Sequence, residues 1–313
     1  MKNPTSLLKP RILFLITLLC AAMASMQNAH AAITWTVQDN GDGAANAANC
    51  PGAGCRLRDA LAAATDGDTI NFSVTTPATI TLSSGQLVVS TSVTVSGPGA
   101  DQLSVNGNAA SGVFSITSGK TVTISGLTIT NGSAPNGGGI FNDHATLTIN
   151  NCTLSGNSAT TAGAGGGGVF NDGESSSATV TINDSTLSGN SATSAGGGGG
   201  GVFNDGGNNG NATMAINYST LSGNSATNGG GGGLNQGNGG NATLTIKNST
   251  LSGNSATTGG GILSLALSPP NNATVTLGNT ILNAGDSGEN VANGGGSVTS
   301  LGYNISSDNG GGF

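Results

Sequence analysis

The sequence predicts an all-β protein, a single-stranded right-handed parallel β-helix (solenoid) with a short N-terminal capping helix. Three observations predict this class: an internal repeat of about 30 residues, short segments in which apolar and polar residues alternate, and an excess of glycine. Of the 313 residues, 56 are glycine, which is well above average usage. Collagen needs glycine at every third position and abundant proline, but these glycines are clustered and the chain has 8 prolines. The glycines therefore indicate sharp corners between strands.

The N-terminus has the three parts of a secretory signal peptide. Basic side chains come first, an apolar run follows over residues 12–23, and the Ala-His-Ala of residues 29–31 matches a cleavage site. We expect residues 1–31 to be removed on export, and no transmembrane segment is expected in the mature chain. The remaining chain has four basic and fourteen acidic side chains, hence a net charge of −10. Nucleic-acid binding needs a basic patch, so this balance excludes it.

Residues 32–68 are expected to form an N-terminal cap. Leu57, Ala60, Leu61 and Ala64 have the i, i+3, i+4, i+7 spacing of an amphipathic helix. Such a helix would cover the first winding, whose open edge would otherwise pair with other chains.

Three cysteines remain after the signal peptide. Cys50 and Cys55 are close enough in sequence to close a small disulfide loop if the exported compartment is oxidising. Cys152 stands where sibling repeats carry serine, so we expect a small strand residue there and not a reactive thiol.

The repeat is clearest over residues 137–283. The octapeptide TLSGNSAT begins at Thr153, Thr186, Thr220 and Thr250, and a block such as ATLTIN alternates aliphatic residues with threonine. Alternation with a period of two is typical of a half-buried strand, so each period is expected to hold three short strands. A further block places an aliphatic residue after three glycines, and these residues should be equivalent: Ile140, Val169, Val202, Leu234 and Ile262.

Weaker repeats extend this pattern in both directions. Residues 69–136 contain degenerate windings with shorter apolar segments, and residues 284–313 are expected to form a C-terminal coil. The sequence shows no second cap helix near that coil. We therefore expect it to continue into a further segment, a partner or a surface attachment.

Asparagine recurs in register inside the octapeptide. We expect a ladder at one corner, in which each side-chain amide bonds the next along the axis. Its members are Asn157, Asn190, Asn224 and Asn254.

Three segments resemble bacterial secreted β-helix proteins. The stretch CRLRDALAAA from Cys55 resembles the CSLREAD domain: Leu57, Arg58 and Asp59 match, while Arg56 replaces the usual small polar residue. The GGGI and LSGN blocks resemble the repeats of polymorphic outer membrane proteins, and LGYNISSDNG from Leu301 is similar to the C-terminal stretch of choice-of-anchor β-helix proteins. The resemblance implies a β-helix that is secreted or displayed on the cell surface or outer membrane of a bacterium. It does not imply a reaction.

The sequence offers weak candidates for one cation site and none for a catalytic or cofactor-binding residue. Asp143, Asp172 and Asp205 occupy the same place in three successive periods and should stack at strand spacing. Calcium would relieve the repulsion of such a column. The alternative, which we favour, is a solvated corner in which each aspartate caps its own turn. His144 has no second histidine or cysteine nearby, so we expect a surface turn residue.

The predicted function is that of a non-catalytic, adhesin-like structural or interaction protein, secreted or on the cell surface, whose partner is a surface protein or a glycan. The alternative is an extracellular polysaccharide-acting enzyme of the pectate-lyase-like superfamily, which would need convergent acids and a base. However, Arg56 and Arg58 lie in the cap, and Lys120 and Lys247 belong to different windings.

A minor alternative is an ice-binding β-solenoid. It is suggested by outward pairs of threonine, although Ala215 breaks one rank and threonine is also common on solvated strands. The pairs are Thr121 and Thr123, Thr146 and Thr148, Thr179 and Thr181, Thr243 and Thr245, and Thr274 and Thr276.

Overall fold

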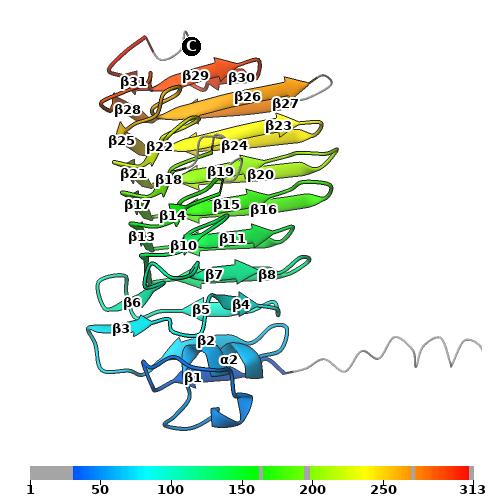
Figure 1. Cartoon of the computed structure of the whole chain (residues 1–313), viewed down its shortest axis with the longest axis vertical. Helices are drawn as coiled ribbons and strands as arrows, with labels where there is room; N and C mark the ends of the chain where they lie inside the picture. Colours follow the sequence, from blue (N-terminus) through cyan, green and yellow to red (C-terminus); the bar gives the residue numbers. More distant parts are fainter. Residues whose placement is uncertain (1–30, 162–164, 194–197, 269–271, 310–313) are drawn as a thin grey trace, which may run out of the picture. The chain divides into compact units, whose positions relative to one another are not determined.

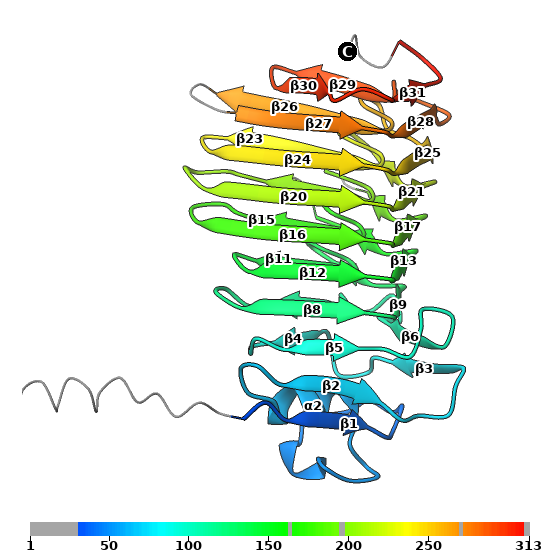
Figure 2. The same ribbon diagram turned by 180° about the vertical axis from the view of Figure 1, so that it is seen from behind.

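The computed structural model describes residues 31–161, 165–193, 198–268 and 272–309. The expected signal peptide lies outside these residues, except for Ala31. From Ile33 onward the described chain forms a parallel β-solenoid, which confirms the predicted fold class (Figure 1). Each winding adds one strand to each of up to four sheets, and Figure 2 shows the same stack from behind. In the described part of the chain, no helix is long and apolar enough to cross a membrane.

Four sheets, here named A to D, run along the stack and pair entirely in parallel. Sheet A contains β1 (Thr34–Val37), β2 (Thr69–Phe72), β5 (Thr94–Ser96), β8 (Thr121–Ser125), β12 (Thr146–Asn150), β16 (Ser177–Asn183), β20 (Asn211–Asn217), β24 (Asn241–Lys247), β27 (Asn272–Gly278) and β30 (Ser297–Ser300). Sheet B contains β3 (Ala78–Thr81), β6 (Leu103–Asn106), β9 (Thr128–Thr130), β13 (Thr153–Ser155), β17 (Thr186–Ser188), β21 (Thr220–Ser222), β25 (Thr250–Asn254), β28 (Ile281–Ala284) and β31 (Ile305–Ser306). Sheet C contains β4 (Leu87–Val89), β7 (Phe114–Ile116), β11 (Ile140–Asp143), β15 (Val169–Asp172), β19 (Val202–Asp205), β23 (Gly233–Asn238), β26 (Ile262–Ser268) and β29 (Val291–Gly294). Sheet D contains β10 (Ser133–Ala134), β14 (Ser158–Ala159), β18 (Ser191–Ala192) and β22 (Ser225–Ala226).

The repeats stack residue on residue, because equivalent positions of successive windings pair in register. Ile149 pairs with Ile182 in sheet A, and Leu154 pairs with Leu187 in sheet B. These inward side chains are fully buried and form one continuous core. Burying an aliphatic side chain of this size stabilises the fold by about 1.5–3 kcal/mol.

A fourth sheet adds one short strand to four of the described windings, whereas windings such as that of β24, β25 and β26 hold the expected three strands. In three of its four copies the octapeptide TLSGNSAT is divided between two strands: its TLS lies in sheet B and its SA in sheet D, with a glycine and an asparagine between them. The chain turns at this glycine, as at Gly189, whose φ is +61°. A Cβ on Gly189 would meet nothing within 4 Å, so the left-handed backbone and not a lack of space favours glycine.

The register of one repeat also differs from the sequence prediction. Gly233, not Leu234, pairs with Val202 and Ile262, while Leu234 pairs with Phe203. Leu234 thereby extends an outer apolar column that begins with the stacked rings of Phe141, Phe170 and Phe203. Because five glycines precede Leu234, the sequence is compatible with Leu234 opposite either Val202 or Phe203. In the structure Leu234 lies opposite Phe203 and packs in its cluster.

The corner from sheet A to sheet B holds one residue per winding in the left-handed region. Asn151, Asp184, Asn248 and Asn279 adopt φ values of +49° to +52°. Asparagine and aspartate tolerate this conformation better than other residues that carry a Cβ. Tyr218 occupies the same corner at φ +51°.

The N-terminal end is covered by a single helix, as predicted. Helix α2 (Leu57–Ala63) buries Leu57, Ala60 and Leu61 and contacts β1, β2 and β4. A short 3₁₀ turn, η2 (Ala47–Asn49), packs beside it. Strand β1 already belongs to sheet A, so the region predicted as a cap also contributes a strand to the first winding.

Candidate functional site

The outer face of sheet A presents two columns of threonine and almost no charge. The pairing register aligns one column over all ten strands, interrupted among the described residues only by Ala215: Thr34, Thr69, Thr94, Thr123, Thr148, Thr181, Ala215, Thr245, Thr276 and Thr299. The second column comprises Thr121, Thr146, Thr179, Thr213, Thr243, Thr274 and Ser297. The columns place hydroxyl and methyl groups at strand spacing along this face.

Asparagine side chains flank these columns and bond to one another. Asn183 and Asn217 each donate from Nδ2 to Oδ1 of the asparagine one winding earlier, at 2.9 and 3.0 Å. On the other flank, Asn241 and Asn272 do the same at 3.0 and 3.2 Å. Side-chain ladders of this kind hold a multistranded sheet flat.

The four asparagines singled out in the octapeptide lie in one buried column between sheets B and D. Asn157, Asn190, Asn224 and Asn254 are at most 1% exposed. Each of the first three donates from Nδ2 to Oδ1 of the next at 2.9 Å, and that same oxygen accepts the backbone N–H at 3.0 Å. Every amide in the middle of the column therefore bonds both neighbouring windings, which avoids the 1–3 kcal/mol that a buried unpaired polar group costs.

A second buried ladder, which the sequence analysis missed, runs along sheet C. Asn142 donates to Asn171, Asn171 to Asn204, and Asn204 to Asn235, at 2.7–2.8 Å between Nδ2 and Oδ1. All four are fully buried. Three of the four asparagines stand in the repeated FND triplets of the sequence, and Asn235 stands in the equivalent place of the next winding.

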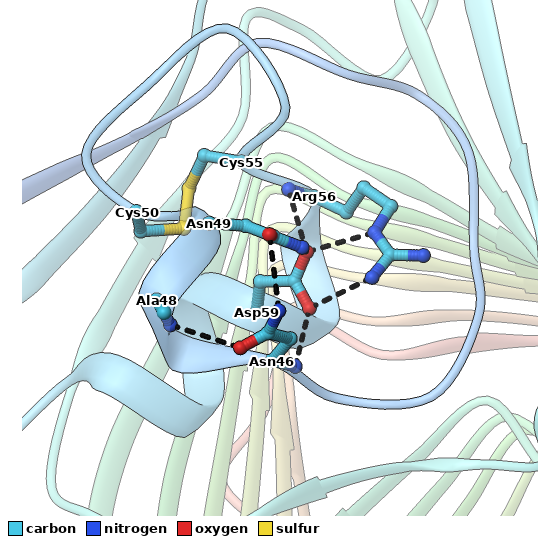
Figure 3. Close-up of a disulfide and its surroundings, with 7 residues drawn as sticks. All are labelled: Asn46, Ala48, Asn49, Cys50, Cys55, Arg56 and Asp59. Carbon is cyan, nitrogen blue, oxygen red and sulfur yellow. Dashed lines mark hydrogen bonds and ion pairs between the residues drawn. A yellow bond between two sulfur atoms is a disulfide. The ribbon is translucent and has the colours of Figure 1, made fainter.

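Both arginines of the cap form ion pairs with aspartates whose side chains are at most 2% exposed. Asp59 is fully buried and accepts hydrogen bonds from the Arg56 guanidinium at 2.7 and 3.0 Å, from the Asn46 N–H at 2.7 Å and from Asn49 Nδ2 at 3.0 Å (Figure 3). Burial alone would raise the pKa of Asp59, but these donors outweigh it and lower that pKa to about 2. Beside this pair, Cys50 and Cys55 form a disulfide with a Cα–Cα distance of 4.7 Å.

Two further carboxylates tie the cap to the first windings. Asp42 pairs with Arg58 at 2.8 and 3.1 Å and accepts the N–H groups of Ser83 and Ser84. Buried Asp68 accepts the indole N–H of Trp35 at 2.9 Å, and its donors hold its pKa well below the ordinary value despite burial. Arg56 and Arg58 are therefore structural residues of the cap.

The candidate cation ligands lie where sheet C turns toward sheet A. Asp143 pairs in register with Asp172, and Asp172 with Asp205, so the three carboxylates form one column. Gln236 continues the column in the next winding, and its side chain hydrogen-bonds Asp205. Asp205 Oδ1 is buried without a hydrogen-bond partner.

His144 joins this column, which the sequence analysis did not expect. Its Nδ1 contacts Asp143 Oδ1, and its Nε2 contacts the carbonyl oxygen of Glu174. Ligand atoms of Asp143, His144 and Asp172 all lie within 4.8 Å of one another. His144, Asp172 and Glu174 also line a surface hollow of about 410 Å³ with three serines.

Three groups here, His144, Asp172 and Asp205, have raised pKa values. Burial raises the pKa of Asp205 to about 7, and the charges of Asp172 and Glu174 add to this rise. Burial likewise raises the pKa of Asp172. For His144, burial acts downward, but the Glu174 carbonyl and Asp143 outweigh it and raise the pKa. Both imidazole nitrogens face acceptors, an arrangement that suits the doubly protonated ring.

The geometry limits the chemistry of the cluster. Calcium takes about six to eight oxygen ligands, whereas the close group consists of two carboxylates and one imidazole, and His144 supplies positive charge to Asp143 and Asp172 when protonated. Bringing a metal there would require the imidazole to lose a proton. A carboxyl group with a pKa near 7, such as that of Asp205, can act as an acid or a base, but Asp205 is not among the residues that line the hollow.

Cys152, which lies outside the disulfide, is in an environment that disfavours the thiolate. Cys152 is buried in line with Ser185, whose Oγ accepts the Cys152 N–H at 3.1 Å. Burial raises the pKa of Cys152 to about 11. A thiol in this state is a poor nucleophile.

Fold and surface together define a parallel β-solenoid with a capped N-terminal end and a long uncharged face. No protein-family model matches the chain, and no curated protein matches it either. Among solved structures it is similar to the pectate lyase Pel9A, at 15% identity and a TM-score of 0.41 over 87% of this chain and 79% of that one. It is also similar to the A-module of the Azotobacter vinelandii mannuronan C-5 epimerase AlgE6, at 12% identity and a TM-score of 0.26 over 92% and 94% of the two chains. These similarities concern the β-helix architecture alone.

Proposed function

We propose that this chain is a non-catalytic β-solenoid, secreted or displayed on a bacterial surface, that acts by binding a surface protein or a glycan through its outer faces. The observation that carries this proposal is the face of sheet A, where threonine columns framed by asparagine ladders repeat over successive windings. A repeated uncharged surface suits an extended partner better than a single small substrate.

The placement of the basic residues supports the same function. Arg56 and Arg58 are engaged inside the cap, and Lys120 lies 3.5 Å from Asp66. A polysaccharide-cleaving site needs its acid and base to converge on one substrate. The resemblances of the sequence to CSLREAD, polymorphic outer membrane and choice-of-anchor proteins accord with export and surface display.

A second candidate function is enzymatic action on an extracellular polysaccharide. It is favoured by His144 and Asp172, because both line the hollow and both have raised pKa values, which would permit proton transfer to a sugar. The two candidates differ in turnover and can be separated by one assay.

The test is incubation of the mature protein with a panel of polysaccharides, followed by measurement of reducing ends and of the ultraviolet absorbance of unsaturated products. We expect no product with the unmodified protein. Product formation that Asp172→Asn abolishes and the exposed-site control Asp101→Asn preserves would overturn the proposal and support the enzyme. Inhibition of ice recrystallisation, measured on the same preparation, tests whether the threonine columns bind ice.

A further inference from the structure

The two tyrosines of the chain lie on one corner of the solenoid. The sequence contains 2 tyrosines, and Tyr218 and Tyr303 are 65% and 90% exposed. Both occupy the corner between sheets A and B, separated by the windings that carry Asn248 and Asn279. Three strand spacings of about 4.8 Å put roughly 14 Å between them along the axis.

Both tyrosines are held in a conformation that their side chains disfavour. Their φ values are +51° and +59°, whereas Asn248 and Asn279 fill the same corner position at +52° and +51°. A left-handed backbone costs a bulky residue on the order of 1–2 kcal/mol relative to its preferred conformation. Exposed aromatic side chains at strained positions bring the fold no compensating burial, and strain of this kind is found at functional sites.

The space between the tyrosines is a polar hollow. A depression of about 440 Å³ is lined by Tyr218, Tyr303, the two asparagines, Ser249 and Thr250, with Ile281 and Ile305 at one side. Asn279 Nδ2 donates to Asn248 Oδ1 at 2.7 Å. This bond links the two asparagines that lie between the tyrosines along the corner, so it holds both amides at the hollow.

A positive charge stands next to this hollow. Lys247 lines a second depression, of about 200 Å³, together with the same two asparagines, Leu301 and Tyr303. Lys247 is exposed, and of the four basic side chains after the signal peptide it is the one that forms no ion pair within the described residues. The two depressions share Asn248, Asn279 and Tyr303, so one ligand can reach both.

We propose that this corner is a glycan-binding site, which takes a short stretch of an extended polysaccharide and prefers one whose sugars carry carboxylates. Tyrosine offers a large rigid contact face at low entropic cost, which suits the apolar face of a sugar ring. The amides and hydroxyls between the rings match sugar hydroxyl groups, and Lys247 matches a carboxylate. This inference rests on the proposed binding function and assigns it to one site.

The test is affinity electrophoresis in native gels that contain polygalacturonate, its methyl-esterified form or neutral galactan. The variants are Tyr218→Asn and Tyr303→Asn, because asparagine already fills this corner in other windings and relieves backbone strain. We therefore expect these variants to stay folded. Their thermal unfolding midpoints check this, so that a loss of binding can be assigned to the lost side chain. The matched control is Asn151→Gly, an uncharged change at an exposed residue of the same corner two windings before Tyr218.

We expect polygalacturonate to retard the unmodified protein and each tyrosine variant to bind about tenfold more weakly, with the control unchanged. Lys247→Gln should weaken binding to polygalacturonate and leave binding to the methyl ester as it was. Absence of retardation in all three gels, or equal retardation of the tyrosine variants, would overturn the glycan site. So would a dimer in sedimentation that Tyr303→Asn disperses, because a second copy would then be the occupant. Turnover of any polymer would instead contradict the proposed non-catalytic function. The glycan site would still be tested by the binding of the tyrosine and Lys247 variants.

Discussion

Asp205 should make the stability of the solenoid depend on pH in a way that one substitution removes. Its folded-state pKa is about 7, against an ordinary value of 3.8. A raised carboxyl pKa means that the native state favours the protonated form, so stability is full below about pH 4 and falls as pH rises toward 7. Asp205→Asn keeps the shape and removes the charge. The difference of about three pKa units corresponds to about 4 kcal/mol gained by the variant above pH 7.

Thermal unfolding followed by circular dichroism at pH 4 and pH 8.5 measures this effect. For a chain of this length, 1 kcal/mol shifts the midpoint by about 2 °C, so the variant should unfold roughly 8 °C higher at pH 8.5. At pH 4 the two midpoints should nearly coincide. The exposed-site control Asp286→Asn should leave the midpoint within about 1 °C at both values.

Two outcomes would refute this reasoning. An equal gain at both pH values would mean that the amide packs better than the carboxyl, independent of charge. A loss of stability at pH 8.5 would mean that ionised Asp205 is stabilised by contacts that outweigh its burial and its repulsion by Asp172 and Glu174.

Three further predictions concern the cap, the ladder and the thiol. Asp59→Asn should lower the free energy of unfolding at pH 7 by about 3 kcal/mol, because it leaves the partly buried Arg56 without its carboxylate; equal midpoints in urea would contradict this. Asn190→Ala should lower the free energy of unfolding by about 2 kcal/mol, because it breaks the buried ladder. Asn217→Ala, on the outer ladder, should lower it by less than about 1 kcal/mol. Urea titrations in which Asn217→Ala is the more destabilised variant would contradict this reasoning. Cys152 should resist iodoacetamide in the native protein and react after denaturation, as mass spectrometry can show; rapid native labelling would mean that its strand opens.

Most of the fold could be predicted from the sequence because the repeat is nearly identical in successive windings. Identical blocks pair in register, so the alternation in ATLTIN and its relatives fixes which residues face the core. The helix over Leu57–Ala63 was visible because it has the one helical spacing in a chain of strands. The register of Leu234 could not be predicted, because the glycines before it have no side chains that would show which residue faces the core.

The sites were less predictable, because their residues come together through corners and not through strands. His144 reaches Asp172 and Glu174 from a turn at φ +49°, a conformation that histidine seldom adopts. Tyr218 and Tyr303 are 85 residues apart in sequence and meet only because the windings between them stack. Repetition reveals what all windings share, whereas a binding site depends on what a few of them do not share.

The amide ladders have opposite polarity inside and outside the solenoid. The buried columns donate toward later windings, as from Asn157 to Asn190, while the outer columns donate toward earlier ones, as from Asn183 to Asn150. Dipoles aligned head to tail add along an axis, as they do in a helix. The dipoles of the outer ladders oppose those of the buried ladders. Adding a winding that extends both kinds of ladder therefore adds side-chain dipoles that offset each other.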